Sequence, residues 1–348
     1  MIRILDREVG THVRPYLIAE MSGNHNQSLE RALAIVDAAA QAGADAIKLQ
    51  TYTAETMTLD VRAPGFVIDD PGSIWKGRQL YELYQEAHTP WDWHRPIMER
   101  ATQHGLHCFS TPFDDTAVDF LESLNVPAYK IASFENTDLP LIRRVARTGK
   151  PMIISTGMAT AAEIDEAVRT ARDAGARDIV LLKCTSTYPA SPENTNVRTI
   201  PNMRDACGCE VGLSDHTMGC GVAVAAVALG AVMVEKHFTL RRADGGVDSA
   251  FSLEPEEFSQ LRAETERAWQ GLGSVLYGGT RSEEKSRIFR RTLYIARDMK
   301  AGERLTADNL RIVRPGFGLP PKYYETVLGK RVNADVPAGT PMSWELLA

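Results

Sequence analysis

The sequence predicts an α/β protein in which a (β/α)8 (TIM) barrel is followed by a small β-rich C-terminal domain. Eight short apolar runs alternate with helical patterns through most of the chain. Such runs are typical of strands buried on both faces of a parallel sheet, and eight strand–helix units within about 250 residues favour a barrel over a doubly wound sheet. Glycines around residues 271–279 precede a charged stretch and indicate a domain boundary. We therefore expect a barrel over 1–278, a linker over 279–290 and a small domain over 291–348.

The eight predicted strands follow one another in order. They are 16–19, 46–49, 107–109, 128–131, 152–154, 179–182, 210–213 and 232–234. Three helix starts are visible between them: Ser28, Thr89 before a proline, and Thr160 with Glu163 at capping-box spacing. A further helix is expected over about 255–271. The 18 uncharged residues 217–234 are interrupted by glycines, so we interpret them as a buried helix and a strand rather than a membrane span.

One strand–helix unit is much longer than the others. Residues 51–76 contain Pro64-Gly65 and the turn-forming run Asp69-Asp70-Pro71-Gly72, with little periodicity. A long insertion after a barrel strand lies on the catalytic face, which favours a substrate loop or lid. The alternative is a surface loop without a function.

Composition excludes several classes of protein. The 348-residue chain has 39 Lys and Arg against 45 Asp and Glu, a net charge of −6, so it is a poor candidate for binding nucleic acid. Its five cysteines are odd in number and scattered, which favours a reducing compartment. The charged start of the chain lacks the apolar core of a signal peptide. We expect a cytoplasmic protein that binds neither nucleic acid nor a membrane.

Polar side chains follow every predicted strand at its carboxyl end, where a barrel has its active site. In chain order they are Glu20, Asn24 and His25; Lys48 and Gln50; Ser110 and Thr111; Lys130, Ser133 and Glu135; Ser155 and Thr156; Thr185, Ser186 and Tyr188; Ser214, Asp215 and His216; Glu235 and His237. Each alone could belong to a turn. Basic, hydroxyl and imidazole groups from eight strand ends together indicate a binding site.

Two of these residues, Lys48 and Lys130, indicate an anionic ligand. Each lies inside an apolar strand, where an unpaired ammonium group is costly and a bound anion would offset that cost. Hydroxyl groups that could donate to phosphate or carboxylate oxygens come from Ser133, Ser155, Ser186 and Ser214. The alternative is that each lysine pairs with a neighbouring carboxylate such as Glu20 or Glu135.

His216 and His237 close the last two strands, which are neighbours in a closed barrel. They are 21 residues apart, the length of one strand–helix unit, so the two imidazoles could converge. Two neutral imidazoles and water suit Mn2+, Zn2+ or a similar divalent ion. Either residue could equally be a core histidine with its hydrogen bonds satisfied.

Eight segments carry a resemblance that covers nearly the whole chain in order. They are 18–26 (IAEMSGNHN), 48–51 (KLQT), 109–113 (FSTPF), 130–133 (KIAS), 155–158 (STGM), 184–189 (CTSTYP), 212–217 (GLSDHT) and 235–239 (EKHFT). They resemble the sialic acid synthases, which condense phosphoenolpyruvate with an N-acetylated sugar. The tail, with Arg314-Pro315-Gly316 and Leu328-Gly329-Lys330, resembles the antifreeze-like (SAF) domain of that family.

Within the family, the chain looks most like the branch that makes pseudaminic acid. The pointers are Met21-Ser22-Gly23, Gln50-Thr51-Tyr52-Thr53, 80–84 (LYELY), Ala132-Ser133-Phe134-Glu135 and 317–322 (FGLPPK). This likeness implies a metal-dependent transferase that joins phosphoenolpyruvate to 2,4-diacetamido-2,4,6-trideoxy-L-altrose and releases phosphate, in nonulosonic acid biosynthesis.

The resemblance also implies roles for individual residues. His216 and His237 would hold a divalent metal, Mn2+ or Mg2+, and Glu20 would do acid/base work. The phosphoenolpyruvate contacts would be Lys48, Thr111, Lys130, Ser133, Ser155, Ser186 and Ser214. Gln50, Glu135, Tyr188 and Asp248 would position sugar or water. The small domain would cover the barrel of a partner subunit in a homodimer, with Arg314 reaching the sugar's acetamido group.

Three other functions remain open from the sequence. Lysines at strand ends are compatible with a Schiff-base aldolase that uses Lys48 or Lys130. An N-acetylneuraminate or legionaminic acid synthase would run the same chemistry on another sugar. The chain could also be a non-catalytic carbohydrate-binding protein with an inert barrel.

Overall fold

The computed structural model describes residues 2–348 as two compact units. The first ends at Gly273 and the second covers Ser274–Ala348. Each unit is described by itself.

The first unit is the predicted barrel. Its eight strands are all parallel, and they close in sequence order because the last strand pairs with the first. They are β3 (Tyr16–Glu20), β4 (Ala46–Thr51), β5 (His107–Pro112), β6 (Tyr129–Ile131), β7 (Met152–Ser155), β8 (Ile179–Cys184), β9 (Glu210–Ser214) and β10 (Met233–His237). Every predicted strand is present, most of them one or two residues longer than the apolar run.

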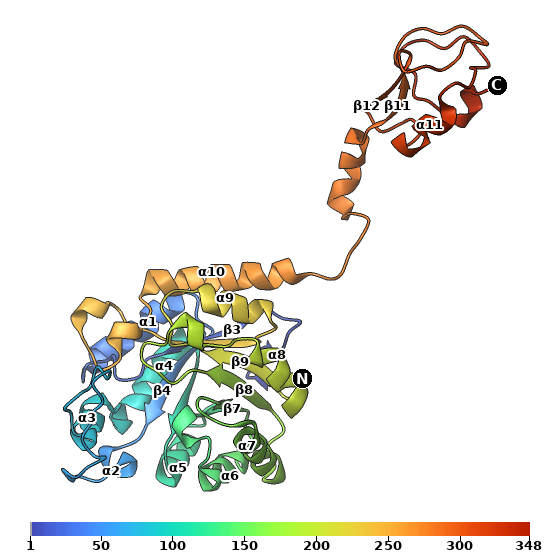
Figure 1. The fold of residues 1–348 in the computed structure, drawn as a ribbon. Helices are drawn as coiled ribbons and strands as arrows, with labels where there is room; N and C mark the ends of the chain where they lie inside the picture. Colours follow the sequence, from blue (N-terminus) through green and yellow to red (C-terminus); the bar gives the residue numbers. More distant parts are fainter. Residues whose placement is uncertain (1) are drawn as a thin grey trace. The chain divides into compact units, whose positions relative to one another are not determined.

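Helices form the outer layer around these strands (Figure 1). They are α1 (Leu29–Gln41), α4 (His94–Gln103), α5 (Asp115–Ser123), α6 (Leu139–Ala146), α7 (Ala161–Asp173), α8 (Thr199–Cys207), α9 (Gly221–Ala228) and α10 (Pro255–Leu272). Short 3-10 turns are η1 (Trp91–Trp93), η2 (Ser133–Glu135), η3 (Pro192–Asn194), η4 (Arg242–Asp244) and η5 (Ser249–Phe251).

All three predicted helix starts are found, and two of them have a side-chain cap. The hydroxyl of Ser28 accepts a hydrogen bond from the Arg31 amide at 3.2 Å, and Thr160 and Glu163 form the capping box. After Thr89 and Pro90 the chain enters η1, which runs directly into α4, but Thr89 does not cap it; its hydroxyl lies 3.2 Å from Nε2 of His25. The uncharged stretch 217–234 forms α9 and the start of β10 as predicted, and in residues 2–348 no helix has the length and apolarity needed to cross a membrane.

Apolar side chains form two separate layers in the barrel. Outward-facing residues of the strands pack against the helices, and inward-facing ones fill the barrel interior. The interior is closed at its amino-terminal end by a hairpin that sequence reasoning missed, β1 (Ile2–Ile4) with β2 (Arg7–Val9). Ile2, Ile4 and Val9 of this hairpin pack in the same cluster as Tyr16 and Phe109, so water is kept out of the lower half of the barrel.

The long insertion after β4 is a folded structure rather than an open loop. It contains α2 (Ala54–Met57) and α3 (Leu80–Ala87). Between them the chain folds back on itself, with the Ile68 amide donating to Arg78 O and the Leu80 amide to Phe66 O, both at 2.9 Å.

The second unit has a small core of its own. Its regular elements are β11 (Thr292–Ile295) and β12 (Leu310–Val313), which pair antiparallel, α11 (Tyr324–Val327), and the 3-10 helices η6 (Arg281–Phe289), η7 (Pro321–Tyr323) and η8 (Trp344–Leu346). Its buried cluster consists of Leu293, Ile295, Met299, Leu305, Leu310, Val327, Val332, Val336 and Met342.

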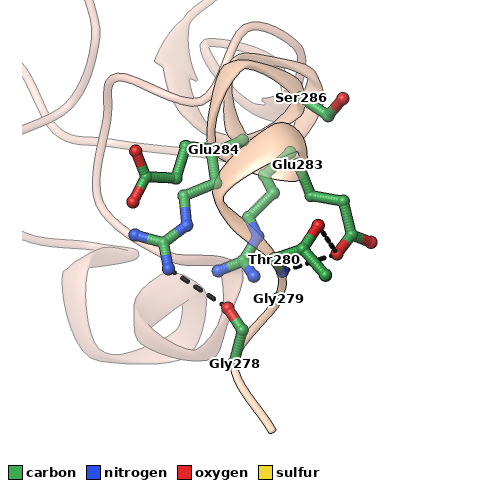
Figure 2. A pocket seen from close by; sticks show the side chains of 8 residues that line it. Gly278, Gly279, Thr280, Glu283, Glu284 and Ser286 are labelled. Carbon is green, nitrogen blue, oxygen red and sulfur yellow. Dashed lines mark hydrogen bonds between the residues drawn. The ribbon is translucent and has the colours of Figure 1, made fainter. Parts of the chain in front are cut away.

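Residues 279–290, predicted as a linker, form mostly η6. The Thr280 amide donates to Oε2 of Glu283 at 2.7 Å, and Arg287 Nη2 donates to Gly278 O at 3.2 Å (Figure 2). These residues border a polar hollow of about 390 Å3. All side chains of this segment are exposed, so local hydrogen bonds, not a core, hold it in shape.

The hairpin beneath the barrel yields a stability prediction. Ile4 is fully buried, so Ile4→Ala should lower the free energy of unfolding by roughly 2–5 kcal/mol, the usual cost of such a cavity. The same substitution at Ile74, which is 48% exposed, should leave stability nearly unchanged. Urea unfolding followed by circular dichroism measures both; equal effects would show that the hairpin does not seal the barrel.

Candidate active site

Eight side chains, one from each strand, lie inside the barrel at the carboxyl ends of its strands. Because side chains alternate along a strand, the residue two positions beyond each inward-facing core residue also points inward. These residues, here called the polar layer, are Glu20, Lys48, Thr111, Lys130, Ser155, Cys184, Ser214 and Glu235, and all are buried. Seven of them carry polar or charged groups directly above the apolar interior.

Two lysines and two glutamates form a network within the polar layer. Lys48 makes an ion pair with Glu20, and its Nζ lies 3.8 Å from Oε2 of Glu235 and donates to Oγ1 of Thr111 at 3.2 Å. Lys130 Nζ donates to Oε1 of Glu235 at 3.3 Å. Each lysine therefore has a carboxylate partner. Lys48 pairs with Glu20, one of the partners considered from the sequence. Lys130 pairs with Glu235, which was not considered there.

The buried groups of this network shift one another's pKa values. Burial raises the pKa of Glu20 to about 7 against the lowering effect of Lys48. Glu235 is also buried, but the charges of Lys130 and Lys48 outweigh burial and lower its pKa. Burial lowers the pKa of Lys130 despite the charge of Glu235. Near neutral pH a fraction of Glu20 is therefore protonated, which reduces the negative charge of the network.

Hydroxyl groups of two serines, Ser133 and Ser186, lie close to Gly157 beside the polar layer. The Gly157 amide donates to Oγ of Ser133 at 3.1 Å, and a Cβ at this glycine would lie only 2.1 Å from Oγ of Ser186 and 2.7 Å from Oγ of Ser133. Only glycine fits this approach. Oγ of Ser155 is buried and has no hydrogen-bond partner. Since buried polar groups are normally satisfied, this hydroxyl is a free donor for a ligand.

A pocket of about 390 Å3 lies over this end of the barrel. Its polar lining comes from barrel strand ends and the loops after them: Ser22, Gln50, Glu135, Ser186, Tyr188, His237 and Asp248. Gln50 Nε2 donates to Oε1 of Glu20 at 3.0 Å and to Oγ of Ser22 at 3.2 Å. Ser22 in turn bonds to Asp248, so the pocket floor is linked to the polar layer.

Glu135 and Tyr188 face the pocket with altered acidity. Burial raises the pKa of Glu135 to about 7, and Oε2 of this residue has no hydrogen-bond partner. Burial also raises the pKa of Tyr188 strongly, so its hydroxyl stays protonated. Tyr188 is therefore a neutral donor in the pocket, and Glu135 is a carboxyl group that exchanges its proton near neutral pH.

The two histidines lie side by side, with ring centroids 5.4 Å apart. Nδ1 of His216 lies 2.9 Å from the Thr185 carbonyl; a ring nitrogen facing a carbonyl is the donor, so Nε2 has the lone pair when this ring is neutral. Burial lowers the pKa of His216, but contact with Cys184 outweighs burial and raises it. Nδ1 of His237 is buried without a hydrogen-bond partner, 3.8 Å from Oδ2 of Asp248. Burial lowers the pKa of His237 well below its usual value, which leaves that imidazole neutral.

A buried ion pair behind the histidines fixes their backbone. Lys236 Nζ donates to Oδ2 of Asp215 at 2.9 Å and to the carbonyls of Thr217 and Gly219 at 2.6 and 2.9 Å. Each member of the Lys236–Asp215 pair is the chain neighbour of one histidine. All three ammonium protons are used, so the loop after β9 is tied to β10.

The structure thus brings nearly all predicted site residues of the barrel to one place. The polar layer and the pocket together hold Glu20, Lys48, Gln50, Thr111, Lys130, Glu135, Ser155, Ser186, Tyr188, Ser214, His237 and Asp248, with Ser133 and His216 in contact with them. Arg314 belongs to the second unit, where it is exposed after β12.

Comparison with known proteins agrees with this arrangement. The sequence matches the NeuB family over residues 35–277 and the SAF domain over residues 290–348. The chain belongs to the NeuB family. It is 43% identical over 329 residues to the pseudaminic acid synthase of Campylobacter jejuni, covering 94% of this chain and 95% of that protein. It is 42% identical over 330 residues to the pseudaminic acid synthase of Helicobacter pylori, covering 94% and 96%.

A solved structure supports the same assignment. The N-acetylneuraminic acid synthetase of Leptospira borgpetersenii matches with a TM-score of 0.73 and 30% identity, over 82% of this chain and 94% of that one. The resemblance to sialic acid synthases and the barrel-plus-SAF architecture are confirmed.

Two residues of this NeuB-family site were not assigned a role from the sequence. Glu235 accepts from Lys130 and from Ser214, the latter at 3.0 Å. Cys184 Sγ lies 3.7 Å from Oγ of Ser186 and 3.9 Å from Nδ1 of His216. Counting in steps of two along each strand would have placed both in the polar layer, because they follow Met233 and Leu182 of the barrel interior.

The Lys236–Asp215 pair gives a testable prediction. Lys236→Met keeps the length of the side chain but leaves the buried Asp215 charge unpaired, which should cost about 3–5 kcal/mol in unfolding free energy. Adding Asp215→Asn should recover part of that loss. The matched control is Arg169→Met, which breaks an exposed ion pair with Asp165 and should have little effect. Chemical denaturation of the four proteins tests this; a harmless Lys236→Met would refute the anchoring role.

Proposed function

We propose that this protein is a pseudaminic acid synthase. In this reaction C3 of phosphoenolpyruvate attacks the aldehyde carbon of 2,4-diacetamido-2,4,6-trideoxy-L-altrose, water adds to C2, and phosphate leaves by C–O cleavage. The observation that carries the proposal is the polar layer, which sets two lysines and several hydroxyls beneath a pocket flanked by two histidines. The relatives that share 42–43% identity with almost the whole chain carry that name.

Phosphoenolpyruvate would bind in the polar layer. Its negative charges would be met by Lys48 and Lys130, and its oxygens by hydroxyls of Thr111, Ser133, Ser155, Ser186 and Ser214. Two observations support this. The hydroxyl of Ser155 is buried without a partner, and the raised pKa of Glu20, caused by burial, lets that residue give up its charge when an anion arrives.

Glu20 would also move protons during the reaction. A carboxyl group with a pKa near the working pH is suited to both donating and accepting a proton. Gln50, Glu135, Tyr188 and Asp248 would bind and orient the sugar and the attacking water, since all four line the pocket.

His216 and His237 would hold a divalent metal, Mn2+ or Mg2+. The residues fit this role, because Nδ1 of His237 has no hydrogen-bond partner and Nε2 of His216 has a free lone pair when its ring is neutral, the form that metal binding requires. In the described residues no group of three or more His, Cys, Asp and Glu side chains could hold the ion, so substrate and water would complete the coordination. When bound, the metal would polarise the sugar aldehyde as a Lewis acid.

The second unit would complete the site in a homodimer. We propose that it covers the pocket of a partner subunit and that Arg314 reaches an acetamido group there. The first residues of this unit expose large apolar side chains, with Val275 91% and Tyr277 92% exposed, which a partner surface would cover. The enzyme would work in the cytoplasm, where phosphoenolpyruvate is made.

Phosphate release tests the proposed reaction directly. The purified full-length protein, supplied with phosphoenolpyruvate and Mn2+, should release phosphate with 2,4-diacetamido-2,4,6-trideoxy-L-altrose and not with N-acetylmannosamine. Release with the second sugar alone would keep the chemistry and overturn the sugar assignment. If neither sugar gives phosphate release, the aldolase and the binding protein become the leading alternatives. Borohydride trapping of Lys48 or Lys130 would reveal the aldolase.

Substitution of the histidines tests the metal site. His216→Ala and His237→Ala should each lower Mn2+ affinity by at least tenfold, measured by isothermal titration calorimetry, and abolish turnover. His12→Ala is the matched control, because His12 is exposed and pairs only with Glu8. Unchanged metal binding and turnover in either site variant would refute the assignment.

A further inference from the structure

The pocket has two kinds of wall, and they come from different parts of the chain. Residues 52–87 contribute only apolar or aromatic side chains to the lining of the pocket. The members that define this apolar wall are Met57, Ile68, Trp75, Leu80, Leu83 and Tyr84. The polar lining comes instead from the barrel strand ends and the loops after them. A ligand that fills the pocket therefore meets polar groups of the barrel and an apolar surface of the insertion.

Contacts within and beyond the insertion hold the apolar wall in place. Trp75 Nε1 donates to Val247 O at 2.9 Å, and its ring lies 5.8 Å from that of Tyr188. Tyr52, which is buried, packs edge-on against Tyr84 and Phe113 at 5.8 and 5.2 Å between ring centroids. The wall is thus joined to the barrel on both sides and presents a preformed surface.

The aliphatic part of the wall cannot satisfy a hydroxyl group. A sugar hydroxyl placed against Met57, Ile68 or Leu80 would lose its hydrogen bonds to water and find no donor or acceptor among these side chains, which is costly. A methyl group in the same position would gain from leaving water. The half-buried state of all three means that their apolar surface is still open to such a contact.

We propose that the apolar wall formed by residues 57–84 is the specificity-determining surface for the sugar, and that it accepts the methyl-bearing end of a deoxy sugar. This inference rests on the proposed function, because it takes the reacting aldehyde to lie on the histidine side of the pocket. The 6-deoxy carbon, and the methyl of the 4-acetamido group beside it, lie at the far end of the chain from that aldehyde. A sugar with a hydroxyl at C6 would be discriminated against at this wall.

A pair of sugars that differ in one oxygen atom tests the inference. The substrates are 2,4-diacetamido-2,4,6-trideoxy-L-altrose and its 6-hydroxy counterpart, each used with phosphoenolpyruvate and Mn2+. The wild-type protein should prefer the deoxy sugar in kcat/KM by about 10–200-fold, the range that an apolar pocket achieves for a change of this size. Ile68→Thr should reduce that preference by roughly tenfold, because the new hydroxyl offers a partner.

Two matched variants separate polarity from other effects. Ile68→Val removes one methyl group without adding a hydroxyl, and should keep most of the preference. Ile74→Thr makes the same chemical change at an exposed residue of the insertion that does not line the pocket, and should keep all of it. The hydrogen bonds by which Ile68 holds the folded-back insertion are made by its backbone amide and carbonyl. Ile68→Thr therefore retains them.

The outcomes are distinguishable. If the wild-type protein consumes the deoxy sugar but Ile68→Thr keeps the full preference, the inference fails and the proposed function stands. If the wild-type protein releases no phosphate with either sugar, the proposed function fails and this inference with it. A change in sedimentation of Ile68→Thr with an unchanged preference would make the wall a subunit contact, which also overturns the inference.

Discussion

The four buried charges of Lys48, Lys130, Glu20 and Glu235 constrain the rest of the barrel. They lie one layer above an interior packed with Phe109 and other apolar side chains, so water cannot reach them from below. Charges in such a place must be paired or bound by a ligand. The closed sheet supplies the pairing, because closure brings residues of the same height on different strands within hydrogen-bonding distance. The site is thus a consequence of barrel closure and of the alternation of side chains along each strand.

Strand β10 connects this network with the two histidines. Glu235 and His237 point toward the barrel interior and the pocket, while Lys236 between them points the other way and makes its buried ion pair with Asp215. Because side chains alternate along a strand, one five-residue strand contributes to the charged network, to the histidine pair and to the buried ion pair. The inward residues face the proposed binding site, and the outward residue anchors the neighbouring loop that carries His216.

Much of this could be predicted from the sequence, because barrel strands and caps are local patterns. The strands, the Ser28 and Thr160 caps and the polar strand ends are all encoded within a few residues. What could not be predicted depends on contacts between distant parts of the chain. The partner of Lys130 is Glu235, 105 residues away, and the hairpin under the barrel pairs residues whose short runs give no clear period. Thr89 has a helix-start pattern, yet contact with His25 engages its hydroxyl.

The insertion and the barrel divide the work of recognition in a physically sensible way. Positions in the polar layer are fixed by eight hydrogen-bonded strands, and a shift of one strand would break the ion pairs of its neighbours. Chemistry that depends on sub-ångström placement belongs there. The apolar wall rests on α2, α3 and the segment between them, which contact the barrel and its loops through side chains such as Trp75 and Tyr84. Side chains on this wall can be exchanged without disturbing the charges below, so substrate choice can change while the reaction stays the same.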